Sequence, residues 1–218
     1  MTREKYQRTL VDLDAQVAEM AALARSMLHD GLTAFETLDH GLATVVRGRE
    51  GALAQLDEDI ETEAFQIISL QGPVASDLRR IGAALKLITY LNRVGRYGFD
   101  IASIAESWPK GREHVARLVG LREMAAKVAQ MLDLVLEAFH GHKAPEMAML
   151  QALEDDVDAM RYTIFREALT YMAQDSQNIE PCSHYMMAAR YLERCGDNVC
   201  KMAEKLYYAA TGKRGNIK

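Results

Sequence analysis

The sequence contains few prolines, cysteines and aromatic residues, and each scarcity argues against a class of protein. Its 218 residues include 4 prolines, 3 cysteines and 7% aromatic residues. Strands are enriched in aromatic and β-branched residues, so the low aromatic content disfavours a sheet-rich architecture. The cysteines, Cys182, Cys195 and Cys200, are odd in number and lack CxxC spacing, so we expect reduced thiols in a cytoplasmic protein.

The sequence also lacks long apolar runs and an excess of positive charge. No run of about 18 or more uncharged apolar residues occurs, so we expect no signal peptide, no membrane span and at most a peripheral position at a membrane. The chain carries 26 Lys and Arg against 31 Asp and Glu, a formal net charge of −5. Because nucleic-acid binding draws mainly on a local excess of cations, we expect no nucleic-acid partner.

Apolar residues recur at alternating spacings of three and four. Two such stripes are Leu10, Leu13, Val17, Met20, Ala24 and Met27, and Leu118, Leu121, Ala125, Val128, Leu132, Val135 and Phe139. A mean period near 3.5 residues places each set on one face of a long helix that packs at a shallow angle against its neighbours. The pattern predicts an all-α fold.

Turn-forming residues divide the chain into six long segments. Breaks are expected near Asp39, Gly72, Pro109, Gly141 and Ser176. Three segments lie on each side of Pro109. We therefore expect six long helices that form two tandem, duplicated three-helix bundles, residues 1–108 and 109–218.

Two pairs of related segments support the duplication. The acidic segment 56–61 (LDEDIE) reappears 97 residues later as 153–158 (LEDDVD), and 91–95 (LNRVG) reappears 101 residues later as 192–196 (LERCG). The two offsets differ by about one helical turn, so the order and approximate spacing of the segments are kept. A repeat of this kind indicates two copies of one helical unit.

Clustered acids are the main candidates for a binding site. Glu154 and Asp158 lie four apart and share a helix face, as do Glu193 and Asp197 in the last predicted helix. Like charges at this spacing destabilise a helix slightly, so we expect a nearby positive charge to offset them. If the two helices pack together, four carboxylates could converge, and oxygen ligands of this kind suit hard or borderline metal cations.

Ordinary ion pairs on a solvated face are the alternative. Arg161 lies three residues after Asp158, Arg190 three before Glu193, and Lys201 four after Asp197. These spacings allow side chains to meet on one helix face, so basic residues could neutralise the acids.

No pattern in the sequence predicts catalysis. We find no glycine-rich phosphate loop, no GxSxG and no HExxH. Glu137 and His140 form a single ExxH, whereas di-iron bundles use two. We expect a protein that is not an enzyme.

Two segments resemble the PhoU family of phosphate-uptake regulators. Residues 73–81 (PVASDLRRI), followed by Ala84, Leu85 and Lys86, resemble the start of that family's third helix. Residues 191–198 (YLERCGDN) are similar to its LERxGD signature, which carries an E(D)xxxD metal-binding motif. With two copies in order, the resemblance covers nearly the whole chain.

The resemblance implies a non-enzymatic adaptor between a phosphate ABC transporter ATPase and a sensor histidine kinase. It also implies a metal cluster, iron or zinc, in which Glu193 and Asp197 face Glu154 and Asp158, and it implies a homodimer. We expect the protein to associate with itself or with the transporter ATPase, through exposed residues such as Arg79 and Arg80.

The first half departs from the family pattern, because Asn92 and Arg96 replace its Glu and Asp. Arg96 would bring a fixed positive charge that could pair with Asp57 or Glu61, so we expect that half to be metal-free. Two alternatives stay open: a PhoU-like accessory protein of another transporter without metal, and a carboxylate-bridged metalloenzyme.

Overall fold

A computed structural model describes residues 3–115 and 119–217, and every regular element within them is helical. The elements are α1 (Arg3–Thr37), α2 (His40–Gly48), α3 (Glu50–Gln71), α4 (Ala75–Ser107), α5 (Val119–His140), α6 (Met147–Gln174), the 3-10 helix η1 (Ser176–Asn178) and α7 (Ile179–Thr211). The predicted all-α class and the six long helices are confirmed.

The predicted apolar stripes form the core. All six residues of the first stripe, from Leu10 to Met27, are fully buried. In the second stripe, Leu121, Val128 and Phe139 are among the buried residues, whereas Leu118 lies outside the described residues. The three-and-four spacing therefore identified the faces that pack together.

The predicted breaks coincide with helix ends that have clear chemical causes. Asp39 precedes α2, and its side chain accepts a hydrogen bond of 2.9 Å from the backbone N–H of Leu42. Gly72 ends α3 in the left-handed conformation, φ 55°, which glycine adopts without steric cost. Gly212 ends α7 in the same way, with φ 71°.

One further break was not predicted. The second expected helix is divided at Arg49 into α2 and α3. Arg49 donates a hydrogen bond of 2.6 Å to Asp30 of α1, and Gly48 and Gly51 flank it. Glycine lowers helix stability, so the helix can break here while Arg49 forms an ion pair with the neighbouring helix α1.

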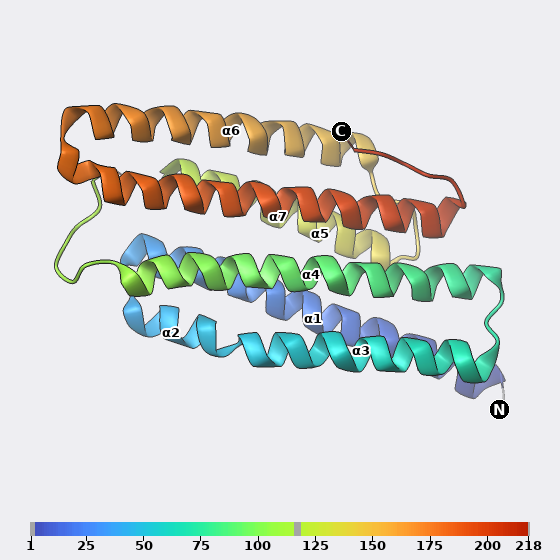
Figure 1. Cartoon of the computed structure of the whole chain (residues 1–218). Helices are drawn as coiled ribbons and strands as arrows, with labels where there is room; N and C mark the ends of the chain where they lie inside the picture. Colours follow the sequence, from blue (N-terminus) through green and yellow to red (C-terminus); the bar gives the residue numbers. More distant parts are fainter. Residues whose placement is uncertain (1–2, 116–118, 218) are drawn as a thin grey trace.

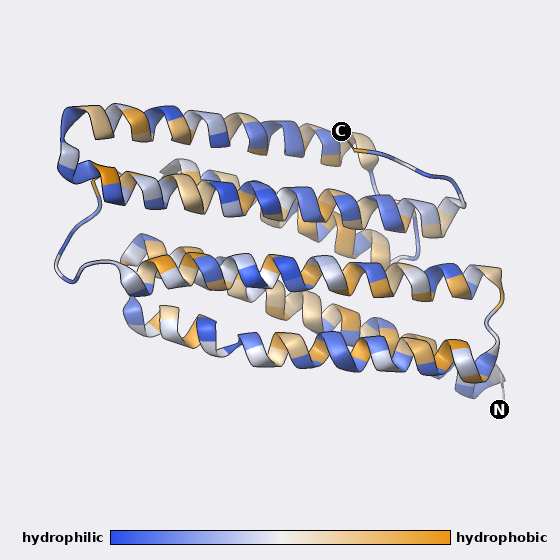
Figure 2. Cartoon of the chain, viewed as in Figure 1, coloured by the Kyte–Doolittle hydropathy of each residue, from blue (hydrophilic) through white to orange (hydrophobic). Residues whose placement is uncertain are grey.

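The helices run side by side along one long axis, and α4 and α7 meet in the middle of the molecule (Figure 1). On one side of this meeting, α4 packs against α1, α2 and α3; on the other, α7 packs against α5 and α6. Figure 2 shows hydrophilic and hydrophobic residues interspersed along each helix, as expected where one face is buried and the other solvated. The division into residues 1–108 and 109–218 stays a prediction.

Glycines bring α1 and α4 into backbone contact. A Cβ atom placed on Gly98 would overlap the backbone of Met27, and one placed on Gly31 would overlap the carbonyl of Gly98. Two helices can approach this closely only where neither carries a side chain at the crossing. These glycines therefore set the distance between α1 and α4.

The segment after α4 is held by both halves. Trp108 is buried and donates a hydrogen bond from Nε1 to the carbonyl of Arg112, at 2.9 Å. His114 lies 2.8 Å from the carbonyl of Phe35 in α1, and its other ring nitrogen lies 3.1 Å from the hydroxyl of Tyr185 in α7. One imidazole thus connects a helix of the first half with a helix of the second.

Candidate functional site

The predicted acidic residues lie on neighbouring helices. Glu154 and Asp158 belong to α6, Glu193 and Asp197 belong to α7, and the two helices pack against each other. The pKa of Glu154 is raised to about 7, first by burial and then by the negative charges of Asp158 and Asp197. The negative charges of this acidic cluster, Glu154, Asp158, Glu193 and Asp197, therefore act on one another across the packed α6 and α7 helices.

Glu193 is the buried member of this acidic cluster, with 8% of its surface exposed. It lies 2.6 Å from Arg190, 3.8 Å from Arg161 and 3.9 Å from Arg194. Burial and the charge of Asp197 raise its pKa, and the three arginines partly oppose that rise. Its Oε2 atom is buried without a hydrogen-bond partner.

The expected ion pairs are only partly those observed. Arg190 pairs with Glu193 as predicted. Arg161, expected beside Asp158, lies instead near Glu193, and Lys201, expected beside Asp197, donates to Glu204 at 3.0 Å. Asp197 pairs with Arg194 at 3.2 Å, a partner that was not predicted.

Glu154 and Asp158 keep free carboxylates. Within the described residues, neither makes a hydrogen bond or an ion pair. No group of three or more His, Cys, Asp or Glu side chains in that part of the chain is gathered closely enough to hold a metal ion. The oxygen donors nevertheless suit hard or borderline cations, and the unpartnered Oε2 atom of Glu193 is of the same kind.

The corresponding place in the first half differs from the prediction. Arg96 pairs at 2.8 Å with Glu50, near the start of α3, and neither with Asp57 nor with Glu61. The Arg96 side chain is mostly exposed. Asp57, half-buried, has an Oδ1 atom without a hydrogen-bond partner. The expectation that Arg96 pairs with Asp57 or Glu61 is therefore wrong.

The two residues of the single ExxH, Glu137 and His140, contact other groups. Glu137 accepts a hydrogen bond of 2.8 Å from Lys143, and His140 lies edge-on against the ring of Phe139. Glu137 and His140 therefore each contact a neighbouring residue of the same segment and do not contact each other in these interactions.

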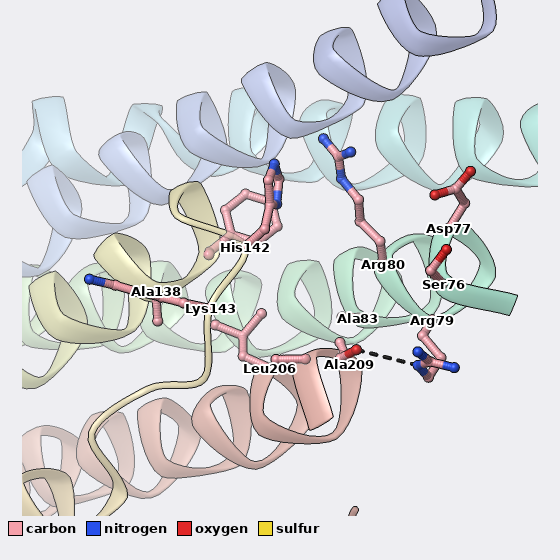
Figure 3. Close-up of a pocket in the computed structure, with 12 residues that line it drawn as sticks. Ser76, Asp77, Arg79, Arg80, Ala83, Ala138, His142, Lys143, Leu206 and Ala209 are labelled. Carbon is pink, nitrogen blue, oxygen red and sulfur yellow. Dashed lines mark hydrogen bonds between the residues drawn. The ribbon is translucent and has the colours of Figure 1, made fainter. Parts of the chain in front are cut away.

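A cavity of about 360 Å³ was not predicted from the sequence. It lies between the start of α4, the segment after α5 and the end of α7 (Figure 3). Arg79 and Arg80 line it, and both are half-buried, so the expectation of exposed arginines is wrong. Arg79 and Arg80 were the only residues of this cavity for which the sequence predicted a binding role, because the other walls come from segments distant in the chain.

Comparison with known proteins gives matches that cover nearly the whole chain. The family model described as PhoU domain matches residues 17–105 and again residues 121–206. A relative from Caulobacter vibrioides is 32% identical over 97% of this chain and 92% of its own, and one from Rhizobium meliloti is 31% identical over 95% and 87%. Both are named phosphate-specific transport system accessory protein PhoU homolog.

The solved structure of PhoU from Pseudomonas aeruginosa has the same fold. It aligns with a TM-score of 0.89 and 28% sequence identity, covering 95% of this chain and 100% of that one. Among the described residues, no helix is both long enough and apolar enough to cross a membrane.

Proposed function

The chain belongs to the PhoU family, and on that premise we propose that it is a non-enzymatic regulator of phosphate uptake and phosphate signalling. The observation that carries the proposal is similarity along nearly the whole chain to relatives named as accessory proteins of phosphate-specific transport. Both copies of the domain are present, and no insertion large enough to form another domain separates them.

We infer that it acts by binding the phosphate ABC transporter ATPase and a sensor histidine kinase in the cytoplasm. The test is copurification of the tagged chain with the purified ATPase, and separately with the cytoplasmic part of the kinase, from the same genome. The ATPase of an unrelated ABC transporter is the control. Retention of both partners, but not of the control, is expected; retention of neither would contradict the proposal.

We also propose that the second half binds a metal cation, iron or zinc, through Glu154, Asp158, Glu193 and Asp197. Support comes from the free carboxylates of Glu154 and Asp158 and from the pKa of Glu154, which neighbouring negative charges help to raise. A bound ion would supply positive charge that offsets these acids. Binding requires the side chains to turn toward one another, and Glu193 to exchange part of its arginine contacts for the ion.

The second candidate is an accessory protein of another transporter that uses no metal. The three arginines around Glu193 favour it, because they already supply positive charge to the buried carboxylate. Metal content near zero, together with selective retention of the other transporter's ATPase, would favour this candidate.

We further propose that the chain forms a homodimer. Exposed apolar side chains on α6, Tyr162, Phe165 and Leu169, recur at helical spacing and offer surface that a second copy would cover. Light scattering coupled to size-exclusion chromatography measures the mass directly. A single species at the 24.4 kDa of one chain at micromolar concentration would contradict the proposal.

A further inference from the structure

The cavity at the end of the bundle combines basic groups with an apolar wall. Ser76, Arg79 and Arg80 come from the first turns of α4, and His142 and Lys143 from the segment after α5. The apolar wall is formed by the side chains of Ala83, Ala138, Phe139, Leu206, Ala209 and Ala210. Its volume, about 360 Å³, lies within the range of small-molecule sites in proteins.

Most charges around this cavity already have partners. Arg80 pairs with Asp14 of α1, and His142 lies 3.7 Å from the same carboxylate. Lys143 pairs with Glu137 at 2.8 Å. These groups shape the cavity, but their charge is largely balanced.

The acid among the residues that line the cavity, Asp77, is engaged too. Asp77 accepts a hydrogen bond of 2.8 Å from the hydroxyl of Tyr6. This contact draws the carboxylate toward α1.

Arg79 is the exception among the basic residues. Its Nε atom donates one hydrogen bond of 3.3 Å to the carbonyl of Ala209, and within the described residues no carboxylate lies within ion-pair distance of its guanidinium. Figure 3 shows Arg79 pointing toward the end of α7, away from Arg80. The two terminal nitrogens of its guanidinium fork are left for a bidentate contact with an anion.

We propose that this cavity binds a small amphiphilic organic anion. One carboxylate or phosphate group accepts hydrogen bonds from Arg79, and an apolar body about the size of two fused rings contacts Phe139, Leu206 and the alanines. The ligand bridges the first half, through α4, and the second half, through α7. This inference is independent of the proposed partners and of the metal.

Isothermal titration calorimetry with 1-naphthyl phosphate tests both parts of this chemistry. Inorganic phosphate supplies the anion alone, and 1-naphthol the apolar body alone. We expect one site per chain for 1-naphthyl phosphate, with affinity at least about tenfold higher than for either fragment. Equal affinity for 1-naphthyl phosphate and 1-naphthol would exclude anion recognition, and equal affinity for inorganic phosphate would exclude the apolar contact.

Variants separate recognition from structure. Arg79→Gln should weaken 1-naphthyl phosphate at least about tenfold, because it removes a charge-assisted contact. Ala210→Phe should block the cavity and abolish binding. Arg166→Gln, an exposed arginine on α6, is the matched control and should leave binding unchanged.

The thermal midpoint of each ligand-free variant is measured alongside. If Arg79→Gln lowers the midpoint but leaves the affinity unchanged, Arg79 only caps the end of α7 and the proposal is wrong. Unchanged binding by Ala210→Phe would likewise overturn it, because the ligand would then lie elsewhere.

Discussion

Gly31 of α1 and Gly98 of α4 face each other so closely that a methyl group on Gly31 would overlap the carbonyl of Gly98. The same crossing places Gly98 against the backbone of Met27. Backbone atoms cannot move aside as a side chain can. A methyl group at this crossing would therefore require the two helix backbones to move apart.

Gly98→Ala should lower the free energy of unfolding by about 2 kcal/mol, because the added methyl group forces α1 and α4 apart. The matched control is Gly82→Ala, an exposed position on the same helix with nothing within 4 Å of the added Cβ. Gly82→Ala should raise the free energy of unfolding by about 0.5 to 1 kcal/mol, because alanine has a higher helix propensity than glycine. Urea denaturation followed by circular dichroism measures both, and equal effects would contradict the interpretation of the contact.

Metal content should depend on the two free carboxylates of α6. Glu154→Gln with Asp158→Asn should abolish binding of iron or zinc while preserving the fold, because both changes keep the side-chain shape. Asp155→Asn with Asp156→Asn, exposed acids on the same turns, is the matched control and should keep the metal. Elemental analysis of protein purified without chelator or histidine tag is the measurement. Metal retained by the first double variant would disprove the assignment.

The first half should gain a site when its departures are reversed. Asn92→Glu with Arg96→Asp restores the family's acids and removes the guanidinium that now pairs with Glu50. We expect metal stoichiometry to rise in this variant. Asn92→Gln with Arg96→Gln removes the same cation without adding acids, so it should not change the stoichiometry. Equal metal in both halves of the unaltered protein would show that Arg96 does not prevent binding.

Stability in the presence of chelator should fall as pH rises toward neutrality. The pKa of Glu154 is raised to about 7, so the folded state favours its protonated form. The protonated Glu154 side chain contributes its full stabilisation below the pKa that it has in the unfolded chain. This contribution is lost as pH rises through the pKa that it has in the folded protein. Because solvent screens this partly exposed group, the resulting change in the free energy of unfolding is on the order of 1 kcal/mol. Glu154→Gln should flatten the profile of unfolding free energy between about pH 4.5 and 8, and an unchanged slope would contradict the raised pKa.

The fold could be predicted from the sequence because its signals are local. Residues from Leu10 to Met27 that recur every three or four positions are buried. Asp39 caps the start of α2 with its carboxylate, and Gly72 ends α3 because it has no side chain to oppose a left-handed backbone. The break at Arg49 was not predicted: Gly48 and Gly51 only weaken the helix there, and the ion pair that accompanies the break joins Arg49 to Asp30 on another helix. Sequence spacing carries no information about such a contact.

The acidic cluster was predictable in position but not in its pairing. Residues four apart share a helix face, so Glu154 and Asp158 had to point together. Which arginine reaches which acid depends on how α6 and α7 lie against each other, and Arg161 contacts Glu193 across that interface. The cavity was least predictable, because three distant segments form its walls.

The attachment of His114 to Phe35 on one side and to Tyr185 on the other has a mechanical meaning. Each half is fastened to the connecting segment as well as to the other half along α4 and α7. Any change in the angle between α1 and α7 at this end of the molecule would therefore have to break one of the two His114 contacts as well as disturb the packing of α4 against α7.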